Sequence, residues 1–350
     1  MTVYDACIIG GGPAGLATAI QSKLKGLNVC VFEPKLGVID KACGEGLMPS
    51  AVKNLQEMGV YPDYSHDFNG IRYIDQNGQS ADGFFSQGPG KGVRRLALHK
   101  ALLDRVTQLD IPLFNQSVSS YQEHKDYVQV EHVQCKYVIA ADGLHSPIRK
   151  QLQLQLPPKR RIRLGVRRHY EVQPWSNFVE VYWSEEAEAY VTPVSENQVG
   201  VAILFYKDRA PSGADKYEQL LPLFPELQKR LSNSQYSSHI RGAGPFEQRV
   251  EKGVKGRFFL VGDAAGYLDP LTGEGIKLGL DGAKAVVECI VENRPQQYIV
   301  AHKKILRKYW IMTDGLLRLR QIPLLRKLMI PVLRRIPKLF SVIISTLAAE

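Results

Sequence analysis

The feature that most restricts the fold of this chain is a glycine-rich hexapeptide near its N-terminus, Gly10-Gly11-Gly12-Pro13-Ala14-Gly15. It directly follows an apolar run at 3–9 and precedes a helical pattern at 16–26. A second apolar run comes next, at 28–33. Buried apolar strands on both sides of a helix are typical of a parallel βαβ unit, so the chain is expected to begin with one.

The spacing of the glycines gives this unit a binding function. Gly10 permits the tight turn, Gly12 lets the backbone approach a pyrophosphate, and Gly15 allows the helix to pack closely on the strand. The start of the helix offers unpaired N–H groups to the phosphates, and Glu33 ends the next strand, where an acid accepts ribose hydroxyls. A bound dinucleotide is therefore predicted, with Gly10, Gly12, Pro13, Ala14, Gly15 and Glu33 as its ligands.

A second sheet is predicted further along the chain. Apolar and polar residues alternate between 161 and 205 in segments separated by turn residues, as expected of an antiparallel sheet. Segments 70–75 and 80–85 flank Asn77-Gly78, which predicts a hairpin with a type I′ turn. One helix is expected at 215–231. The last fifty residues are expected to form helical segments interrupted by Pro323, Pro331 and Pro337.

Two further glycine–acid motifs follow buried apolar runs. Ala141-Asp142-Gly143, with Ser146 and Arg149, gives the pattern DGxxSxxR, and Gly262-Asp263 ends another such run. These residues resemble the DG and GD motifs of the p-hydroxybenzoate-hydroxylase-type flavoprotein superfamily. The resemblance implies that the dinucleotide is FAD, that Asp263 binds its ribityl chain, and that the next helix start lies near the pyrimidine edge of the flavin. It adds Asp142, Gly143, Gly262, Asp263, Gly273, Gly275 and Ile276 to the predicted cofactor ligands.

Within this superfamily the chain most resembles the geranylgeranyl reductase family. Lys41-Ala42-Cys43-Gly44-Glu45-Gly46-Leu47 is similar to that family's KPCGGGL-like loop, with Ala42 in place of the usual proline. Arg95-Leu96-Ala97-Leu98-His99 resembles its RxxFD helix start, whose arginine contacts FAD, although His99 replaces the acid. Tyr190-Val191-Thr192-Pro193 and Gly200-Val201-Ala202 loosely resemble its YxWxFP…GxG lipid-site pattern, without the aromatic-rich part. Cys43, Gly44 and Arg95 thus join the predicted cofactor ligands.

Cys43 is the one residue predicted to be catalytic. A thiol beside glycine, on a loop that faces the flavin, can donate a proton or tune the ring. The alternative is a small buried residue that only packs, as free cysteines commonly do. The five cysteines form no CxxC pair, and no Cys/His cluster has metal-ligand spacing, so no metal site is predicted.

The net charge of +10 is concentrated at the C-terminal end. Residues 301–350 hold eleven Lys or Arg against two acids, Asp314 and Glu350. A nucleic-acid-binding enzyme would show basic residues around its cleft, so no nucleic-acid partner is expected. The tail alternates Leu or Ile with Arg or Lys, which fits either peripheral contact with anionic lipid or a helical cap with a basic outer face. The expected location is the cytoplasm, and peripheral contact with the membrane is the second option.

The predicted fold class is α/β: a Rossmann-type FAD-binding lobe interleaved with a mainly antiparallel substrate lobe, followed by a helical tail. The predicted boundaries give residues 1–69, 90–150 and 251–300 to the FAD lobe. Residues 70–89 and 151–250 form the substrate lobe. Residues 301–350 form a basic amphipathic tail.

The predicted function is that of an FAD-dependent oxidoreductase acting on a small lipophilic substrate. The resemblance favours reduction of a carbon–carbon double bond in a prenyl or polyene-like molecule. Two alternatives stay open: an NAD(P)H-dependent monooxygenase that hydroxylates a phenolic, quinone or polyketide substrate, and a non-redox cyclase or partner-binding flavoprotein. NAD(P)H is expected as a transient reductant, since only one dinucleotide motif is present. The cluster Lys159-Arg160-Arg161, Arg163, Arg167 and Arg168 either attracts its phosphate or forms a solvated strand face.

Overall fold

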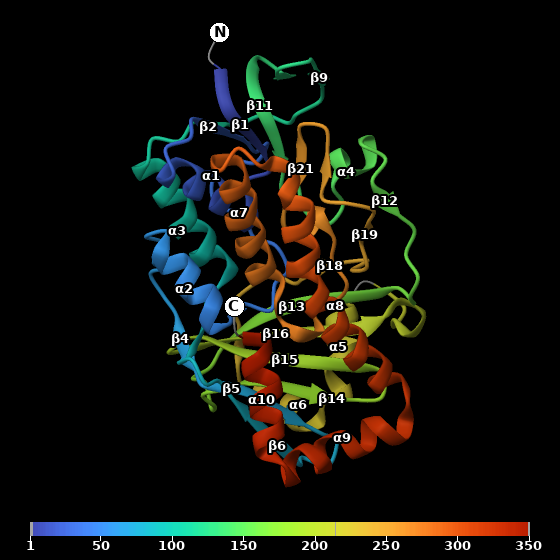
Figure 1. The fold of residues 1–350 in the computed structure, drawn as a ribbon. Coiled ribbons are helices and arrows are strands. Elements are labelled where there is room, and N and C mark those ends of the chain that lie inside the picture. Colours follow the sequence, from blue (N-terminus) through green and yellow to red (C-terminus); the bar gives the residue numbers. More distant parts are fainter. Residues whose placement is uncertain (1–2, 214, 349–350) are drawn as a thin grey trace.

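The structure is a computed structural model that describes residues 3–213 and 215–348. It has two lobes, one above the other in Figure 1, with the C-terminal helices along the side and base of the lower one. The upper lobe is built on a sheet with the strand order β20-β21-β11-β1-β2-β8. Within it β11, β1 and β2 run parallel to one another, and β21 is parallel to β11. The bounds are β1 Val3–Ile9, β2 Val29–Phe32, β8 Leu113–Phe114, β11 Val133–Ala140, β20 Val254–Lys255 and β21 Phe258–Leu260, with β9 Tyr121–Glu123 and β10 Val128–Val130 beside β11.

Helices cover this sheet because each has one apolar side. Leu16, Leu280 and Ile8 are fully buried in one core cluster that joins two helices to β1. The first helix follows the glycine turn, as the sequence predicts, and begins with Pro13 in its first turn, where proline is tolerated. The helices of the upper lobe are α1 Pro13–Leu24, α2 Pro49–Glu57, α3 Arg95–Gln108, α4 Pro147–Gln151 and α7 Gly275–Val291.

The lower lobe is built on a sheet with the strand order β17-β13-β16-β15-β14-β5-β6, and β18 also pairs with β13. Every pair in it is antiparallel except β14 with β5, so the mainly antiparallel second sheet and the α/β fold class are confirmed. The bounds are β5 Gly70–Ile74, β6 Ser80–Phe84, β13 Arg163–Glu171, β14 Val179–Trp183, β15 Ala187–Ser195, β16 Gln198–Tyr206, β17 Gln235–Tyr236 and β18 Arg241–Ala243.

Short strands join the lobes. One small sheet has the order β3-β7-β4, from Gly46–Leu47, Gly90–Gly92 and His66–Phe68, and another pairs β12 (Gln155–Leu156) with β19 (Arg249–Val250). The strands of each large sheet come from separate parts of the sequence, so the chain crosses between the two sheets more than once. The exact lobe boundaries inferred from the sequence stay a prediction.

Three local expectations were wrong. The hairpin of β5 and β6 forms, but Gly78 has a positive φ and Asn77 does not, so the turn is not type I′. The Asp75 carboxylate instead accepts hydrogen bonds from the N–H groups of Asn77 and Gln79, both at 2.9 Å. The single helix expected at 215–231 is divided into α5 (Lys216–Leu220) and α6 (Pro225–Leu231), because prolines 222 and 225 cannot continue it. Pro331 lies inside a helix rather than between two.

The C-terminal helices are α8 Tyr298–Gln321, α9 Pro323–Arg335 and α10 Pro337–Ala348. Buried polar contacts attach α8: the Tyr309 hydroxyl donates to the Asp269 carbonyl at 2.8 Å, and buried Arg320 pairs with buried Glu188. Helix α10 lies on β6, and its Phe340 packs against Tyr73 of the neighbouring β5 at 4.8 Å between ring centroids. In the part of the chain that the structure describes, no helix is both long and apolar enough to cross a bilayer.

Gly83 sets how closely α10 can approach β6. A Cβ atom there would lie 2.7 Å from Ile344 Cγ1 and 3.1 Å from the Phe340 ring, closer than packed carbon atoms come. We expect Gly83→Ala to lower the free energy of unfolding by about 1–3 kcal/mol in chemical denaturation. Gly315→Ala is the matched control, because α8 leaves open space there and alanine favours helix by about 1 kcal/mol. Equal melting temperatures for the Gly83 variant and the wild type would contradict this packing.

Candidate active site

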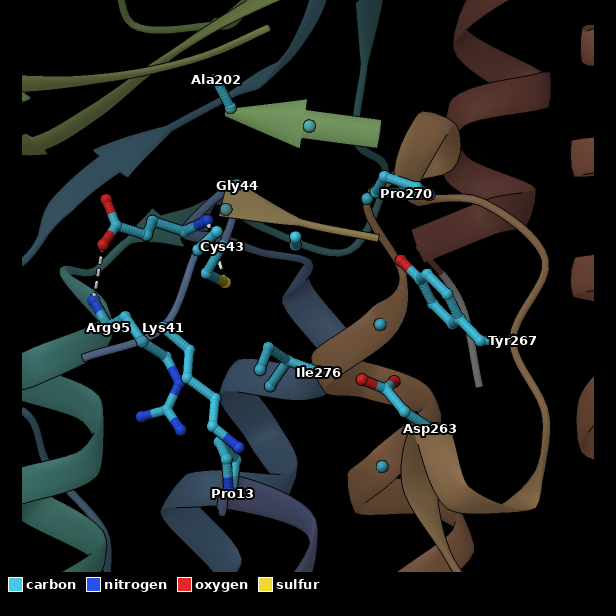
Figure 2. Close-up of a pocket in the computed structure, with 18 of the residues that line it drawn as sticks. Pro13, Lys41, Cys43, Gly44, Arg95, Ala202, Asp263, Tyr267, Pro270 and Ile276 are labelled. Carbon is cyan, nitrogen blue, oxygen red and sulfur yellow. Dashed lines mark hydrogen bonds between the residues drawn. The ribbon is translucent and has the colours of Figure 1, made fainter. Parts of the chain in front are cut away.

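A cavity of about 290 Å³ lies between the lobes. Its upper wall is the glycine turn before α1, the loop that holds Cys43, and the start of α7; its lower wall is the sheet of the second lobe. Figure 2 shows Lys41, Cys43 and Asp263 pointing into the same space, with Tyr267 and Pro270 at its side. Residues from the beginning, middle and end of the chain therefore share one site.

The glycine turn is shaped for close backbone approach. Gly10 has a φ of +110°, and a Cβ atom on it would lie 2.4 Å from the Ala141 carbonyl oxygen. A Cβ atom on Gly15 would lie 1.9 Å from the carbonyl oxygen of Gly10, so this glycine serves packing and does not line the cavity. Gly12 faces open space within the cavity. The turn therefore packs against Ala141 on one side, and on the other side no side chain separates its backbone from a ligand in the cavity.

His99 holds the back of this turn. Its Nε2 lies 2.7 Å from the Gly11 carbonyl oxygen, and its Nδ1 accepts the Ile39 N–H at 3.0 Å. Burial lowers the pKa of His99, although the Gly11 carbonyl opposes that shift. A neutral imidazole with its proton on Nε2 satisfies both contacts. The histidine that replaces the family's acid therefore connects the turn to the loop before Cys43.

Positive charge and helix N-termini converge on one part of the cavity. The helices α1 and α7 both begin at its wall, where their first N–H groups lack intrahelical partners. Lys41 and Arg95 also line it, and Nη1 of the buried Arg95 has no hydrogen-bond partner among the described residues. A buried guanidinium with a free donor calls for an anionic oxygen, which the phosphates of a dinucleotide would supply.

Acids on the cavity wall provide the complementary acceptors. The Glu33 carboxylate accepts the Gly11 N–H at 2.8 Å and the Lys35 N–H at 3.0 Å, and it retains capacity for ribose hydroxyls. The Asp263 carboxylate makes no hydrogen bond within residues 3–213 and 215–348. Burial raises the pKa of Asp263, while Lys41, Arg149 and Arg95 oppose the rise. An unsatisfied carboxylate facing a cavity fits a ligand that brings hydroxyl donors.

Arg149 explains why the DG and GD motifs occur together. Its fully buried guanidinium donates five hydrogen bonds: to the carbonyls of Leu144, Asp263 and Ala264 and to the side chains of Gln155 and Gln248. Ser146 caps the helix that carries it by accepting the Arg149 N–H at 2.9 Å. The pattern DGxxSxxR therefore supports the segment that positions Asp263, and Arg149 itself does not line the cavity.

The Cys43 thiol lies at the junction of the two lobes. Its sulfur accepts the Glu45 N–H at 3.4 Å and lines the cavity. Burial raises the pKa of Cys43, and the Glu45 carboxylate acts in the same direction. The thiol is therefore protonated at neutral pH and suited to donating a proton rather than to acting as a thiolate.

Glu45 connects this loop to the lower sheet. One carboxylate oxygen accepts the Arg95 N–H at 2.8 Å, and the other lies 2.5 Å from Nε2 of the buried His169. His169 Nδ1 lies 2.8 Å from the Ser238 hydroxyl and 3.1 Å from Arg167 Nη1. Burial lowers the pKa of His169, while Glu45 opposes that shift. The pair fixes the Cys43 loop against the substrate sheet.

The lower half of the cavity is mainly apolar, with the buried Arg167 of β13 as its charged exception. Tyr190 lines it but donates its hydroxyl to the Leu271 carbonyl at 2.7 Å, and Thr192 donates to the Gly44 carbonyl at 2.7 Å, so both polar groups are already satisfied. Helix α10 contributes two residues to its wall. The apolar lining comprises Phe68, Ile71, Val179, Val181, Leu204, Phe246, Ile344 and Leu347.

The structure gathers almost all residues selected from the sequence. Of the predicted cofactor ligands only Gly15 is absent from the cavity wall, and that these residues contact FAD stays a prediction. Sequence reasoning missed the roles of Lys41, Glu45, Arg167 and His169. The first three lie in segments that the sequence singled out, but a local pattern does not show which distant residues such side chains meet. In the described ranges, no three metal-ligating side chains come together.

The basic cluster at 159–168 is largely neutralised. Ion pairs join Arg161 to Asp208, Arg163 to Asp269, and Arg167 to Asp40. Arg160 and Arg168 likewise pair with acids of the same chain, Asp314 and Glu218. These contacts favour a structural role for the cluster over attraction of a nicotinamide phosphate.

Comparisons with known proteins agree with this geometry. The family described as "FAD binding domain" matches residues 3–293. The chain is 26% identical to digeranylgeranylglycerophospholipid reductase of Methanococcus aeolicus, over 89% of this chain and 85% of that one. It is 24% identical to menaquinone reductase of Mycobacterium tuberculosis, over 82% and 76%. A flavoprotein/dehydrogenase structure from Cytophaga hutchinsonii superposes with a TM-score of 0.86 at 18% identity, covering 98% and 92%.

The resemblance seen in the sequence motifs is thereby confirmed, and the residues present fit FAD. The bare glycine turn, the free donor on Arg95 and the unsatisfied Asp263 carboxylate match a pyrophosphate and a polyhydroxyl chain. Arg95 and the two helix starts would hold the phosphates, and Glu33 and Asp263 would hold hydroxyl groups.

We expect Asp263→Ala to purify largely without flavin, because the acceptor for the ribityl hydroxyls is lost. Asp263→Asn, which keeps one acceptor, should retain part of it. The readout is flavin absorbance per protein chain after purification. Asp67→Ala, an exposed acid paired with Lys91, serves as the control and should bind FAD fully. Full flavin content in Asp263→Ala would contradict the role assigned to this residue.

Glu274 should make stability depend on pH. Burial raises its pKa to about 7, against the opposing effect of Lys277, and one of its oxygens has no partner among the described residues. The folded chain therefore keeps a proton that the unfolded chain releases near its ordinary value, so stability falls as pH rises from about 4.5 to about 7. The expected loss is about 3 kcal/mol.

Urea denaturation of wild type and Glu274→Gln across this pH window tests the assignment. The variant should lose the decline that Glu274 contributes, whereas Glu57→Gln, at an exposed acid paired with Lys284, should keep it. Parallel curves for wild type and Glu274→Gln would show that Glu274 titrates normally.

Proposed function

Because this chain belongs to the FAD binding domain family and is an FAD-dependent oxidoreductase, we propose that it reduces a carbon–carbon double bond of a prenyl or polyene-like substrate. The observation that carries this proposal is the apolar half of the cavity, which begins beside Cys43 and ends at helix α10. Apolar walls favour a hydrocarbon substrate, because burying apolar surface contributes roughly 25 cal/mol per Å².

Two relatives support the same substrate class. The names of the Methanococcus and Mycobacterium proteins specify a digeranylgeranyl phospholipid and menaquinone, both of which carry polyprenyl chains. We extend this class to the present chain because both relatives are matched over more than three quarters of their length. Either molecule is a rational first substrate for an assay.

Saturation of a double bond requires a hydride at one carbon and a proton at the other. Bound FAD in its reduced form supplies the hydride. The Cys43 thiol holds a proton at the cavity wall, beside the apolar half, and is the proposed donor. Once the proton is given, the Glu45 N–H and the positive charges of Arg95 and Arg167 stabilise the remaining thiolate.

We propose NAD(P)H as the reductant, visiting transiently. The sequence carries one dinucleotide motif, and the residues around it fit FAD, so a nicotinamide would enter and leave through the shared cavity. Anaerobic bleaching of the flavin by NADPH or NADH tests this proposal. Bleaching by dithionite but by neither nicotinamide would point to a protein electron donor.

Anaerobic turnover separates the proposed function from its alternatives. With dithionite as reductant, the prenyl substrate should gain the mass of one hydrogen molecule per bond reduced. Oxygen consumption coupled to NAD(P)H and a phenolic or quinone substrate would instead identify a monooxygenase. Product formed without net electron transfer would favour a non-redox cyclase, and no turnover in any assay would favour a partner-binding flavoprotein.

We expect Cys43→Ala to keep its flavin and its rate of flavin reduction but to lower kcat for double-bond reduction by about 100-fold, the usual effect of removing a general acid. Cys289→Ala is the matched control, since that thiol is also free and lies on α7 away from the cavity. Unchanged turnover in Cys43→Ala would show that Cys43 only packs and donates no proton.

A further inference from the structure

The last helices present an unusual surface, which we call the tail face. Its apolar part consists of large side chains that are each 42–65% exposed, although residues of this kind normally pack inward. Its charged part consists of exposed lysines and arginines on the same helices. The tail face comprises Ile322, Leu324, Leu325, Leu328, Val332, Ile336, Leu339 and Val342, with Lys327, Arg334, Arg335 and Lys338.

The helices that carry the tail face contain no acid of their own, and the exposed Glu185 of the lower sheet region lies near Lys327 alone among its four cations. The sequence contains no Asp or Glu from 315 to 348. Its four cations form no hydrogen bond or ion pair within the described residues, unlike their neighbours Arg318, Arg320 and Arg326, which pair with acids. A cap that only shields the core from water would gain nothing from exposed leucines beside unpaired cations.

The tail face is connected to the cavity through one helix. Leu339 and Val342 of α10 face solvent, while Ile344 and Leu347 of the same helix line the apolar half of the cavity. In Figure 1, α9 lies at the end of the lower lobe away from the upper lobe, and α10 runs from it back toward the lobe junction. A molecule held at the tail face is therefore one helix away from the site.

We propose that the tail face docks on the surface of a bilayer that contains anionic phospholipid. Its apolar side chains enter the boundary between headgroups and acyl chains, and its four cations contact lipid phosphates. A nucleic acid would satisfy the cations but leave the leucines in water, which disfavours it as the partner. Supply of a prenyl lipid from the membrane to the cavity rests on the proposed function, whereas docking itself does not.

Sedimentation of the full-length flavoprotein with vesicles tests the docking. Vesicles of phosphatidylcholine alone are compared with vesicles of phosphatidylcholine and phosphatidylglycerol. The wild type should bind the anionic vesicles and bind the neutral ones weakly. Replacing Lys327, Arg334, Arg335 and Lys338 by Gln should lower the partition coefficient for anionic vesicles by roughly 1,000-fold, since each cation contributes about 1 kcal/mol and every 1.4 kcal/mol is tenfold.

A matched variant separates the tail face from overall charge. Replacing the exposed Lys23, Lys25, Lys125 and Lys229 by Gln removes the same number of charges from other surfaces and should leave binding near the wild-type value. A third variant, Leu324→Ser with Leu328→Ser and Val332→Ser, keeps all cations and should also bind more weakly. Flavin content and melting temperature verify that each variant is folded.

The proposal fails if the wild type does not bind anionic vesicles, or if both charge variants lose binding equally. It also fails if the serine variant binds as well as the wild type, because adsorption would then be purely electrostatic. Sedimentation is read without turnover, so the two proposals fail separately. Vesicle binding without reduction of a prenyl substrate would contradict only the proposed function. Reduction of a detergent-dispersed substrate without vesicle binding would contradict only the docking.

Discussion

The site depends first on one buried cation, Arg149. A guanidinium without water is costly unless all of its donors are used, and here all five are. Two of them end on the backbone carbonyls of Asp263 and Ala264, so the strand-to-helix segment that carries the GD motif is fixed by a residue more than one hundred positions earlier. The unsatisfied Asp263 carboxylate can face the cavity because its backbone is held in this way.

A second buried contact divides the cavity into two chemical halves. Glu45 and His169 join the Cys43 loop of the upper lobe to the sheet of the lower lobe. Above this contact lie the glycine turn, Arg95 and the helix starts, which suit phosphates and hydroxyl groups. Below it lie apolar side chains from the sheet and α10. The thiol sits at the border, where a hydrophobic substrate would meet a polar cofactor.

The C-terminal helices extend this division to the surface. Arg320 of α8 forms a buried ion pair with Glu188 of β15, which attaches α8 to the lower sheet. Arg163 of β13 pairs with both Glu188 and Asp269, which attaches the segment before α7 to the same sheet. Arg318, Arg320 and Arg326 pair with acids of other elements or turns, whereas Lys327, Arg334, Arg335 and Lys338 form no ion pair among the described residues. One tail therefore closes the apolar half of the cavity with one side and offers exposed leucines with the other.

The sequence by itself determined the βαβ unit, the antiparallel second sheet, FAD as cofactor and a set of residues nearly all of which line the cavity. Those features rest on local patterns: glycine spacing, apolar periodicity and short motifs. It missed the Asp75 turn, where a side-chain acceptor stabilises the backbone, the break between α5 and α6 that two prolines cause, and the helical position of Pro331. Only the tertiary structure decided that Glu45 meets His169, that Arg149 supports Asp263 and that α10 walls the cavity. These contacts join residues from distant parts of the chain, and no local pattern encodes which distant partner a buried charge will find.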